Sequence, residues 1–162
     1  INNFEIIYKK KWLQIMRKKT GLFGEENEDE NLINDLFLWM SKNKADYTNT
    51  FCSLMEKDIQ KEKLFESGTF IDWYNRWKTR LALNKKPLKL SLDLMRENNP
   101  LVIPRNHKVE QVLEKASRDS DLKPLNDLLF YLKNPFKHVN GIDDYQKLPK
   151  PNGKIYKTFC GT

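Results

Sequence analysis

Asn98-Asn99-Pro100-Leu101-Val102-Ile103-Pro104-Arg105-Asn106-His107 is the stretch on which the organisation of this 162-residue chain depends. Pro100 and Pro104 exclude a continuous helix, because each proline lacks an amide donor and pushes the residue before it toward an extended conformation. The stretch is therefore predicted to be a short extended bridge between two helices. Arg105, Asn106 and His107 lie at its exit, where Asn106 is placed to cap the next helix.

Helical periodicity dominates the sequence on both sides of this bridge. Apolar residues recur at the three- and four-residue spacing of amphipathic helices, and no alternation typical of β-strands persists. The predicted helical segments are residues 4–20, 28–44, a stretch beginning near 51, 69–83, 88–98, 109–116 and 122–132. We expect an all-α fold, with a helical domain over residues 1–135 and an irregular tail over residues 136–162 that ends near Cys160.

The composition is typical of a folded, water-soluble protein, with 39% hydrophobic, 12% aromatic and 31% charged residues. No apolar run approaches the roughly 20 residues that a membrane-spanning helix needs. Two cysteines, Cys52 and Cys160, are too few for the disulfide framework of a small secreted domain. We therefore expect a cytoplasmic protein without a membrane partner.

The net charge of +7 raises the question of nucleic-acid binding. The lysines are scattered, however, and lysine and asparagine are both abundant, a bias that an AT-rich coding sequence produces by itself. Nucleic-acid interfaces more often combine arginines with exposed aromatic residues. Non-specific nucleic-acid binding therefore stays only a weaker alternative.

Local chemistry explains several polar residues without a catalytic role. Asp46 and Thr48 are good helix-capping residues, which makes Asp46-Tyr47-Thr48 a cap with a buried aromatic beside it. Thr69 with Asp72 resembles a capping box. The acidic run over residues 25–30 is typical of a solvated loop before a helix.

Large aromatic residues recur on one face of the segment over residues 69–83. They are Phe70, Trp73, Tyr74 and Trp77. Such a face normally packs into a core, although it could also form a stacking platform.

The common catalytic motifs are not found in this sequence. It contains neither form of glycine-rich phosphate loop, no H-R-D or D-F-G string, no G-x-S-x-G elbow and no Cys or His spacing typical of zinc. A Cys52–His107 pair that acts in covalent catalysis stays open, but the apolar neighbours of Cys52 favour an inert core thiol. We assign no catalytic, cofactor or metal residue.

A series of short motifs, taken in order, resembles the selenoprotein O family. The motifs are W-x-x-x-M-R-x-K-x-G-L (Trp12 to Leu22), D-Y-T-x-T-F (Asp46 to Phe51), W-x-x-x-Y/W-x-x-R-L (Trp73 to Leu81), M-R-x-x-N-P (Met95 to Pro100), R-N-H (Arg105 to His107), N-P-F (Asn134 to Phe136), Tyr145 with Leu148-Pro149, and a cysteine near the C-terminus. The resemblance extends over the whole chain.

The resemblance implies the C-terminal helical region of a pseudokinase, a protein-kinase-like fold with rearranged active-site residues. That family transfers AMP from ATP, with magnesium or manganese, to Ser, Thr or Tyr hydroxyls of protein substrates. Its nucleotide and metal residues lie in the preceding kinase-like core, which would be the partner of this region. The motif residues expected to be structural are Asp46, Tyr47, Thr48, Asn99, Pro100, Arg105, Asn106 and His107, with Arg105 buried against a carboxylate or a helix end.

The sequence departs from the family pattern at the C-terminus. It ends in Cys160-Gly161-Thr162, without a selenocysteine or a paired cysteine. The resemblance implies a thiol role for Cys160, and an unpaired thiol on a flexible tail is the alternative. A stand-alone helical module that binds a partner protein is the main alternative for the whole chain.

Overall fold

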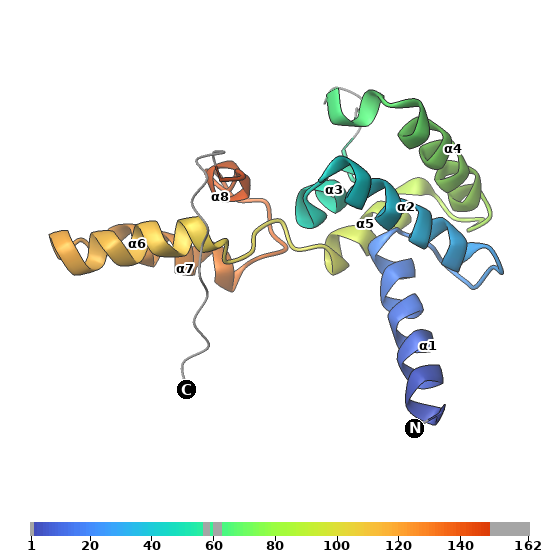
Figure 1. Ribbon diagram of the computed structural model, residues 1–162, viewed down its shortest axis with the longest axis horizontal. Helices are drawn as coiled ribbons and strands as arrows, with labels where there is room; N and C mark the ends of the chain where they lie inside the picture. Colours follow the sequence, from blue (N-terminus) through green and yellow to red (C-terminus); the bar gives the residue numbers. More distant parts are fainter. Residues whose placement is uncertain (1, 57–58, 60–62, 150–162) are drawn as a thin grey trace. The chain divides into compact units, whose positions relative to one another are not determined.

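A computed structural model describes residues 2–56, 59 and 63–149, and over these residues the chain is all-α, as predicted (Figure 1). The chain divides into two compact units, Ile1–Pro100 and Leu101–Thr162. The helices of the first unit are α1 (Asn2–Lys19), α2 (Asp29–Asn43), α3 (Tyr47–Ser53), the 3-10 helix η2 (Lys63–Glu66), α4 (Gly68–Ala82) and α5 (Leu88–Asn98). The helices of the second are α6 (Asn106–Asp119), α7 (Lys123–Lys133) and α8 (Asp143–Gln146).

The proline-bounded bridge is confirmed, because α5 ends at Asn98 and α6 begins at Asn106. The structural units divide within the bridge, after Pro100. The predicted boundary between residues 135 and 136 stays a prediction. The short helix α8 lies inside the segment that was predicted to be an irregular tail, and residues 150–162 lie outside the described part of the chain.

An aromatic core organises the first unit, in which α1 packs against α5 and α2, and α2 packs against α4. Rings follow one another from Phe65 to Trp39, Phe70, Trp73 and Trp77, with successive centroids 5.6, 4.7, 5.7 and 6.0 Å apart. All five side chains are buried. The aromatic face of α4 is therefore a core, as predicted, and not a stacking platform.

Gly21 ends α1 in the manner of a C-terminal cap. Its φ of +72° lies in the left-handed region, and the amide of Leu22 donates a 2.8 Å hydrogen bond to the carbonyl of Arg17. A Cβ at Gly21 would lie 2.9 Å from the carbonyl oxygen of Ser91 and 3.0 Å from Met95. Glycine is required here because the end of α1 lies directly against α5.

The predicted helix caps are partly wrong. Asp46 caps α3 as predicted, because its Oδ1 accepts a 2.9 Å hydrogen bond from the amide of Asn49. The cap of α4 is Ser67 instead of Thr69, and its side chain accepts from the amide of Phe70. Asn106 is the first residue of α6, and the cap position is Arg105, without a side-chain cap bond.

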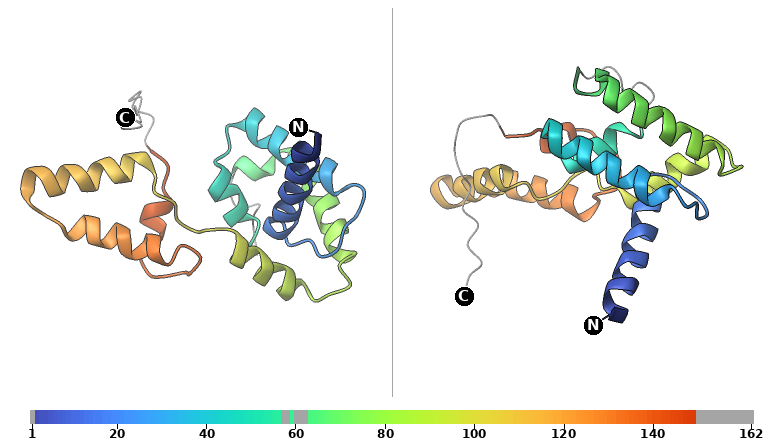
Figure 2. Two further views of the ribbon diagram at one scale, coloured as in Figure 1. Left: turned by 90° about the horizontal axis from the view of Figure 1, so that it is seen from below. Right: turned by 45° about the vertical axis from the view of Figure 1, so that its right-hand side comes forward.

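The second unit is a smaller helical assembly. Its helices α6 and α7 pack side by side as a hairpin (Figure 2). α6 continues to Asp119, three residues beyond the helical segment predicted over residues 109–116, and Ser120 follows it with φ of +55°. The buried apolar side chains of this unit are Val102, Val112, Leu128 and Ile142. Among the described residues, no helix combines the length and the apolar character that crossing a lipid bilayer requires.

Candidate functional site

Side chains on one face of α4 donate hydrogen bonds to the backbone of the segment that follows α1. Trp73 Nε1 donates a 2.8 Å hydrogen bond to the carbonyl of Leu32, and Trp77 Nε1 donates one of 2.9 Å to the carbonyl of Thr20. One turn further on, the Arg80 guanidinium donates to the carbonyl of Phe23 at 3.1 Å. These donors are three or four residues apart, so they lie on one side of the helix. Hydrogen bonds from α4 therefore hold the backbone of the loop after α1 in place.

Asn84 completes this contact just beyond the end of α4. Its Nδ2 donates to the carbonyl of Gly21 and to Ser91 Oγ, both at 2.9 Å, and its Oδ1 accepts from the amide of Phe23 at 2.9 Å. Both ends of one buried amide are thereby satisfied, as buried polar groups require. Asn84 thus joins the loop after α1 to α5 as well as to α4.

A buried carboxylate lies at the start of α2. Asp29 is 0% exposed, and its two oxygens accept hydrogen bonds from Arg17 Nε and Arg80 Nε, each at 2.6 Å. The amide of Glu26 donates a third bond at 3.0 Å. Burial raises the pKa of Asp29, but the bonds from Arg80, Glu26 and Arg17 outweigh burial and leave the pKa below its ordinary value. The carboxylate is ionised at neutral pH and joins α1, α2 and α4.

Asp29 corrects the prediction of a wholly solvated acidic loop over residues 25–30. Five of the six acidic-run positions are exposed or half-exposed, but Asp29 is enclosed by two guanidinium groups. No contact between Arg17, Asp29, Arg80 and Asn84 was predicted from the sequence. Arg17 and Arg80 stand inside the quoted family motifs, and Arg80 follows Trp77 by three residues on the core face of α4, but Asp29 and Asn84 lie outside those motifs.

Lys19 and Asn99 join the end of α1 to the end of α5. The buried Lys19 ammonium donates to the carbonyl of Asn98 at 3.1 Å, and Asn99 Nδ2 donates to the carbonyl of Lys19 at 2.8 Å. The ammonium also lies 4.9 Å from the ring centroid of Phe51 and 5.4 Å from that of Tyr47. Burial lowers the pKa of Lys19, and the neighbouring Cys52 opposes this effect. Asn99, the first residue of the N-P motif, therefore has a structural role in the contact between the ends of α1 and α5.

The Asp46-Tyr47-Thr48 string lies beside this joint. Thr48 is buried, but Tyr47 is half-exposed, so the prediction of a buried aromatic next to the cap is wrong. The Tyr47 ring packs 4.9 Å from Phe51 and 6.0 Å from Phe37. Burial on one side raises the pKa of the Tyr47 hydroxyl. The string caps α3 and covers one side of Lys19.

The Arg105-Asn106-His107 string begins α6 in the second unit. His107 is buried, Arg105 is half-buried and Asn106 is exposed. Burial lowers the pKa of His107, and the charges of Lys108 and Arg105 lower it further, against a hydrogen bond with the backbone of Lys147. His107 is therefore neutral at pH 7. The expected contact of Arg105 with a carboxylate or helix end stays a prediction.

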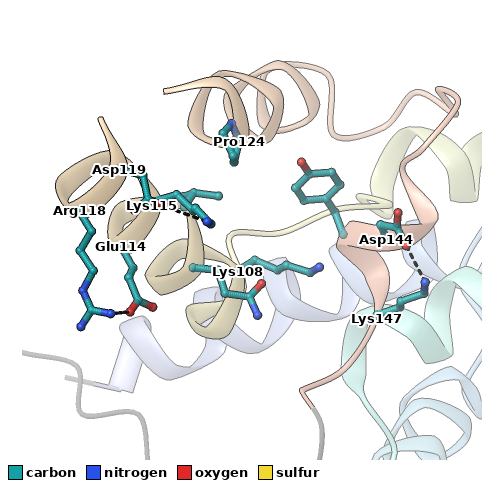
Figure 3. A pocket seen from close by; sticks show the side chains of 11 residues that line it. Lys108, Glu114, Lys115, Arg118, Asp119, Pro124, Asp144 and Lys147 are labelled. Atoms are coloured by element: carbon teal, nitrogen blue, oxygen red, sulfur yellow. Dashed lines mark hydrogen bonds and ion pairs between the residues drawn. The ribbon is translucent and has the colours of Figure 1, made fainter. Parts of the chain in front are cut away.

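A pocket of about 850 Å³ lies on the second unit, along α6 and around α8 (Figure 3). Its charged lining is arranged in pairs: Lys115 with Asp119 at 2.7 Å, Lys147 with Asp144 at 2.5 Å, and Arg118 with Glu114. Lys108 extends over the ring of Tyr145, 5.6 Å from its centroid. Three of the cations that line the pocket therefore bind neighbouring carboxylates.

The remaining candidate residues form no cluster within the part of the chain that the structure describes. No group of three or more His, Cys, Asp or Glu side chains is arranged there to bind a metal ion. We therefore derive no metal-dependent step through residues of this chain. Cys52 Sγ lies 3.7 Å from the carbonyl oxygen of Pro100, in the first unit, whereas His107 belongs to the second. Cys160 lies outside the described residues.

Comparison with known proteins gives the family of this chain. The family model described as "Protein adenylyltransferase SelO" matches residues 1–133. The protein nucleotidyltransferase YdiU of Alcanivorax borkumensis is 46% identical over all 162 residues, and those of Nitrosococcus oceani and Bacillus cereus are each 42% identical. The chain spans about a third of the length of these relatives, 34%, 33% and 33%, and matches their C-terminal part. The chain therefore belongs to the SelO family.

Proposed function

We propose that this chain is the non-catalytic helical region of a protein adenylyltransferase that transfers AMP from ATP to Ser, Thr or Tyr hydroxyls of other proteins. The family match over residues 1–133, together with a span of one third of the relatives, supports this proposal. A kinase-like core with bound ATP and magnesium or manganese would occupy the remaining two thirds. We place the protein in the bacterial cytoplasm, in line with the bacterial source of its relatives.

The observation that best supports a structural role is the use of the buried charges. Asp29, Arg17 and Arg80 bind one another and nearby groups of the same unit, which are backbone atoms, the Asn84 amide and the Glu25 carboxylate. A catalytic carboxylate must instead reach a substrate proton or a metal ion. Phosphoryl-type transfer depends chiefly on positioning and electrostatics, so this region would contribute by completing the fold and presenting protein substrates to the core.

An AMP-transfer assay tests the proposal. The complete gene product and the 162-residue chain would each be incubated with labelled ATP and either magnesium or manganese, with a chelator as the control. We expect label on protein only with the complete product, and none after chelation. Label incorporated by the 162-residue chain alone would refute the non-catalytic role. Absence of label from both would refute the transferase and favour an interaction module.

A further inference from the structure

The first half of α1 carries an apolar stripe that its own unit does not cover. Phe4, Ile7, Tyr8 and Ile15, here called the α1 stripe, follow the spacing of one helix face. Phe4 is 74% exposed, Tyr8 60% and Ile7 58%. In Figures 1 and 2 this half of α1 extends away from the other helices of the first unit. The sequence predicted an apolar face here, but the first unit buries only its C-terminal part.

The stripe continues the buried face of the same helix. Phe4 stacks on Tyr8 with ring centroids 6.2 Å apart, and Trp12, one turn further on, packs 6.1 Å from Phe37. From Met16 onward the helix enters the core. Taking about 150–200 Å² for each large side chain, the exposed part of the stripe amounts to roughly 400 Å². A patch of this size is often functional in a soluble protein.

A groove next to α1 extends the same surface. It has a volume of about 670 Å³, and its apolar lining consists of Ile15, Leu22, Phe23 and Leu94. Ile15 belongs to both the groove and the stripe. The combined surface therefore approaches the 600–1,500 Å² that interfaces between domains of one chain bury.

Lysines flank this surface and indicate the charge of its partner. Lys11 and Lys18 line the groove, and both are exposed, whereas the lining carboxylate Glu25 lies 3.4 Å from Arg17 Nη1. On the other side of α1, Lys9 binds Glu30 of α2 at 2.8 Å. A partner with an apolar centre and an acidic rim matches this arrangement. A second copy of the chain matches it less well, because a two-fold contact brings the same basic flanks together.

We propose that the α1 stripe and its groove bind the part of the same polypeptide that precedes this region in its relatives. The matched region is about a third of the relatives' length and lies at their C-terminal end, so two thirds of such a chain are available as the partner. In the relatives, that part precedes the segment that matches this chain, which begins with α1. This proposal rests on the proposed function for the identity of the partner as a kinase-like core.

Thermal unfolding of Ile7→Asp in two contexts tests the proposal. Leu38 on α2 is 58% exposed, as is Ile7, so Leu38→Asp is a matched control that adds the same charge at a similar surface. In the 162-residue chain we expect neither substitution to change the melting temperature by more than about 1 °C. In the complete gene product we expect Ile7→Asp to lower the melting temperature by about 3 °C or more relative to Leu38→Asp.

Three results would overturn the proposal. The first is equal melting of the two variants in the complete gene product. The second is a 162-residue chain that dimerises in analytical ultracentrifugation and becomes monomeric with Ile7→Asp, while the complete product is unaffected. The third is binding of the complete product to anionic lipid vesicles that Ile7→Asp abolishes. Melting does not depend on AMP transfer, so a failed transferase assay would leave this test valid.

Discussion

Removing the charge of Asp29 should strongly destabilise the first unit. Asp29→Asn keeps the size of the side chain but removes the carboxylate that Arg80 binds, and it leaves Arg17 with the exposed Glu25, 3.4 Å from its Nη1. The amide can still accept one hydrogen bond, but its NH₂ group would face a guanidinium donor. Removing one partner of a buried charge network typically costs 3–5 kcal/mol, because the remaining charge stays desolvated.

The magnitude follows from the burial of all three side chains. Asp29 is fully enclosed, and the exposed fractions of the Arg17 and Arg80 side chains are 10% and 7%, so water screens these charges little. We expect the free energy of unfolding to fall by about 3 kcal/mol or more. For a unit of about 100 residues this corresponds to a drop in melting temperature of about 12 °C or more.

The assay is urea denaturation and thermal melting of the 162-residue chain, with Asp35→Asn as the matched control. Asp35 binds Arg76 at the same 2.6 Å, but both side chains are about half exposed, so the control should lose at most about 1 kcal/mol. The pKa of Asp29 is lowered on folding, so its contribution is present above the ordinary value of 3.8 and is lost as pH falls through the folded value. The wild type and Asp29→Asn should therefore converge in stability below about pH 3.8. Equal stability of Asp29→Asn and Asp35→Asn at pH 7 would refute the reasoning.

Two further substitutions test the end of α1 and the start of α6. Gly21→Ala should destabilise the chain by about 3 kcal/mol in the same denaturation assay, because it adds a Cβ clash with Ser91 to the cost of a positive φ. Gly24 has the same φ of +72° but open space around it, so Gly24→Ala should cost about 1 kcal/mol. Equal losses would show that α5 moves aside. His107 has a pKa below 6.5 in the folded state, so its contribution is present above pH 6.5 and is lost as pH falls through the folded value. After correction for intrinsic rates, the α6 amides should therefore exchange hydrogen faster at pH 5.5 than at pH 7. His107→Gln should reduce this difference between the two pH values. An unchanged difference in the variant would show that another group causes it.

The helices and the bridge were predictable because their causes are local. Two prolines four residues apart fix the bridge, and a three-to-four-residue apolar period fixes each long helix. The cap of α3 was predicted because Asp46 bonds an amide only three residues away. The cap of α4 was missed because Ser67 and Thr69 have the same chemistry, and only the backbone path selects between them. The predicted cap of α6 is displaced by one residue for another reason: the helix already includes Asn106, and the cap position falls on Arg105, whose side chain makes no cap bond.

The central charge network was not predictable from local pattern. Arg17 and Asp29 are 12 residues apart, and Arg80 and Asp29 are 51 apart. In the sequence Asp29 stands among five other acidic or polar residues and has the appearance of a solvated loop position. Burial of a carboxylate is tolerated only where charged donors meet it, and those donors come together only after α1, α2 and α4 have packed. A motif that depends on three helices leaves no fixed spacing in the chain.

The charge network and the α1 stripe act on the same helix from opposite ends. Arg17 lies in the last turn of α1, where Asp29 and Arg80 fix it, while the stripe begins at Phe4. Rotating a helix about its axis by one residue turns each side chain by about 100°, so the contacts at Arg17 also determine which direction the stripe faces. Asp29→Asn should therefore weaken binding of the preceding part of the polypeptide, although Asp29 itself is enclosed within the first unit. In the complete gene product, the losses of melting temperature caused by Asp29→Asn and Ile7→Asp should then be less than additive. Fully additive losses would show that the charge network and the α1 stripe act independently.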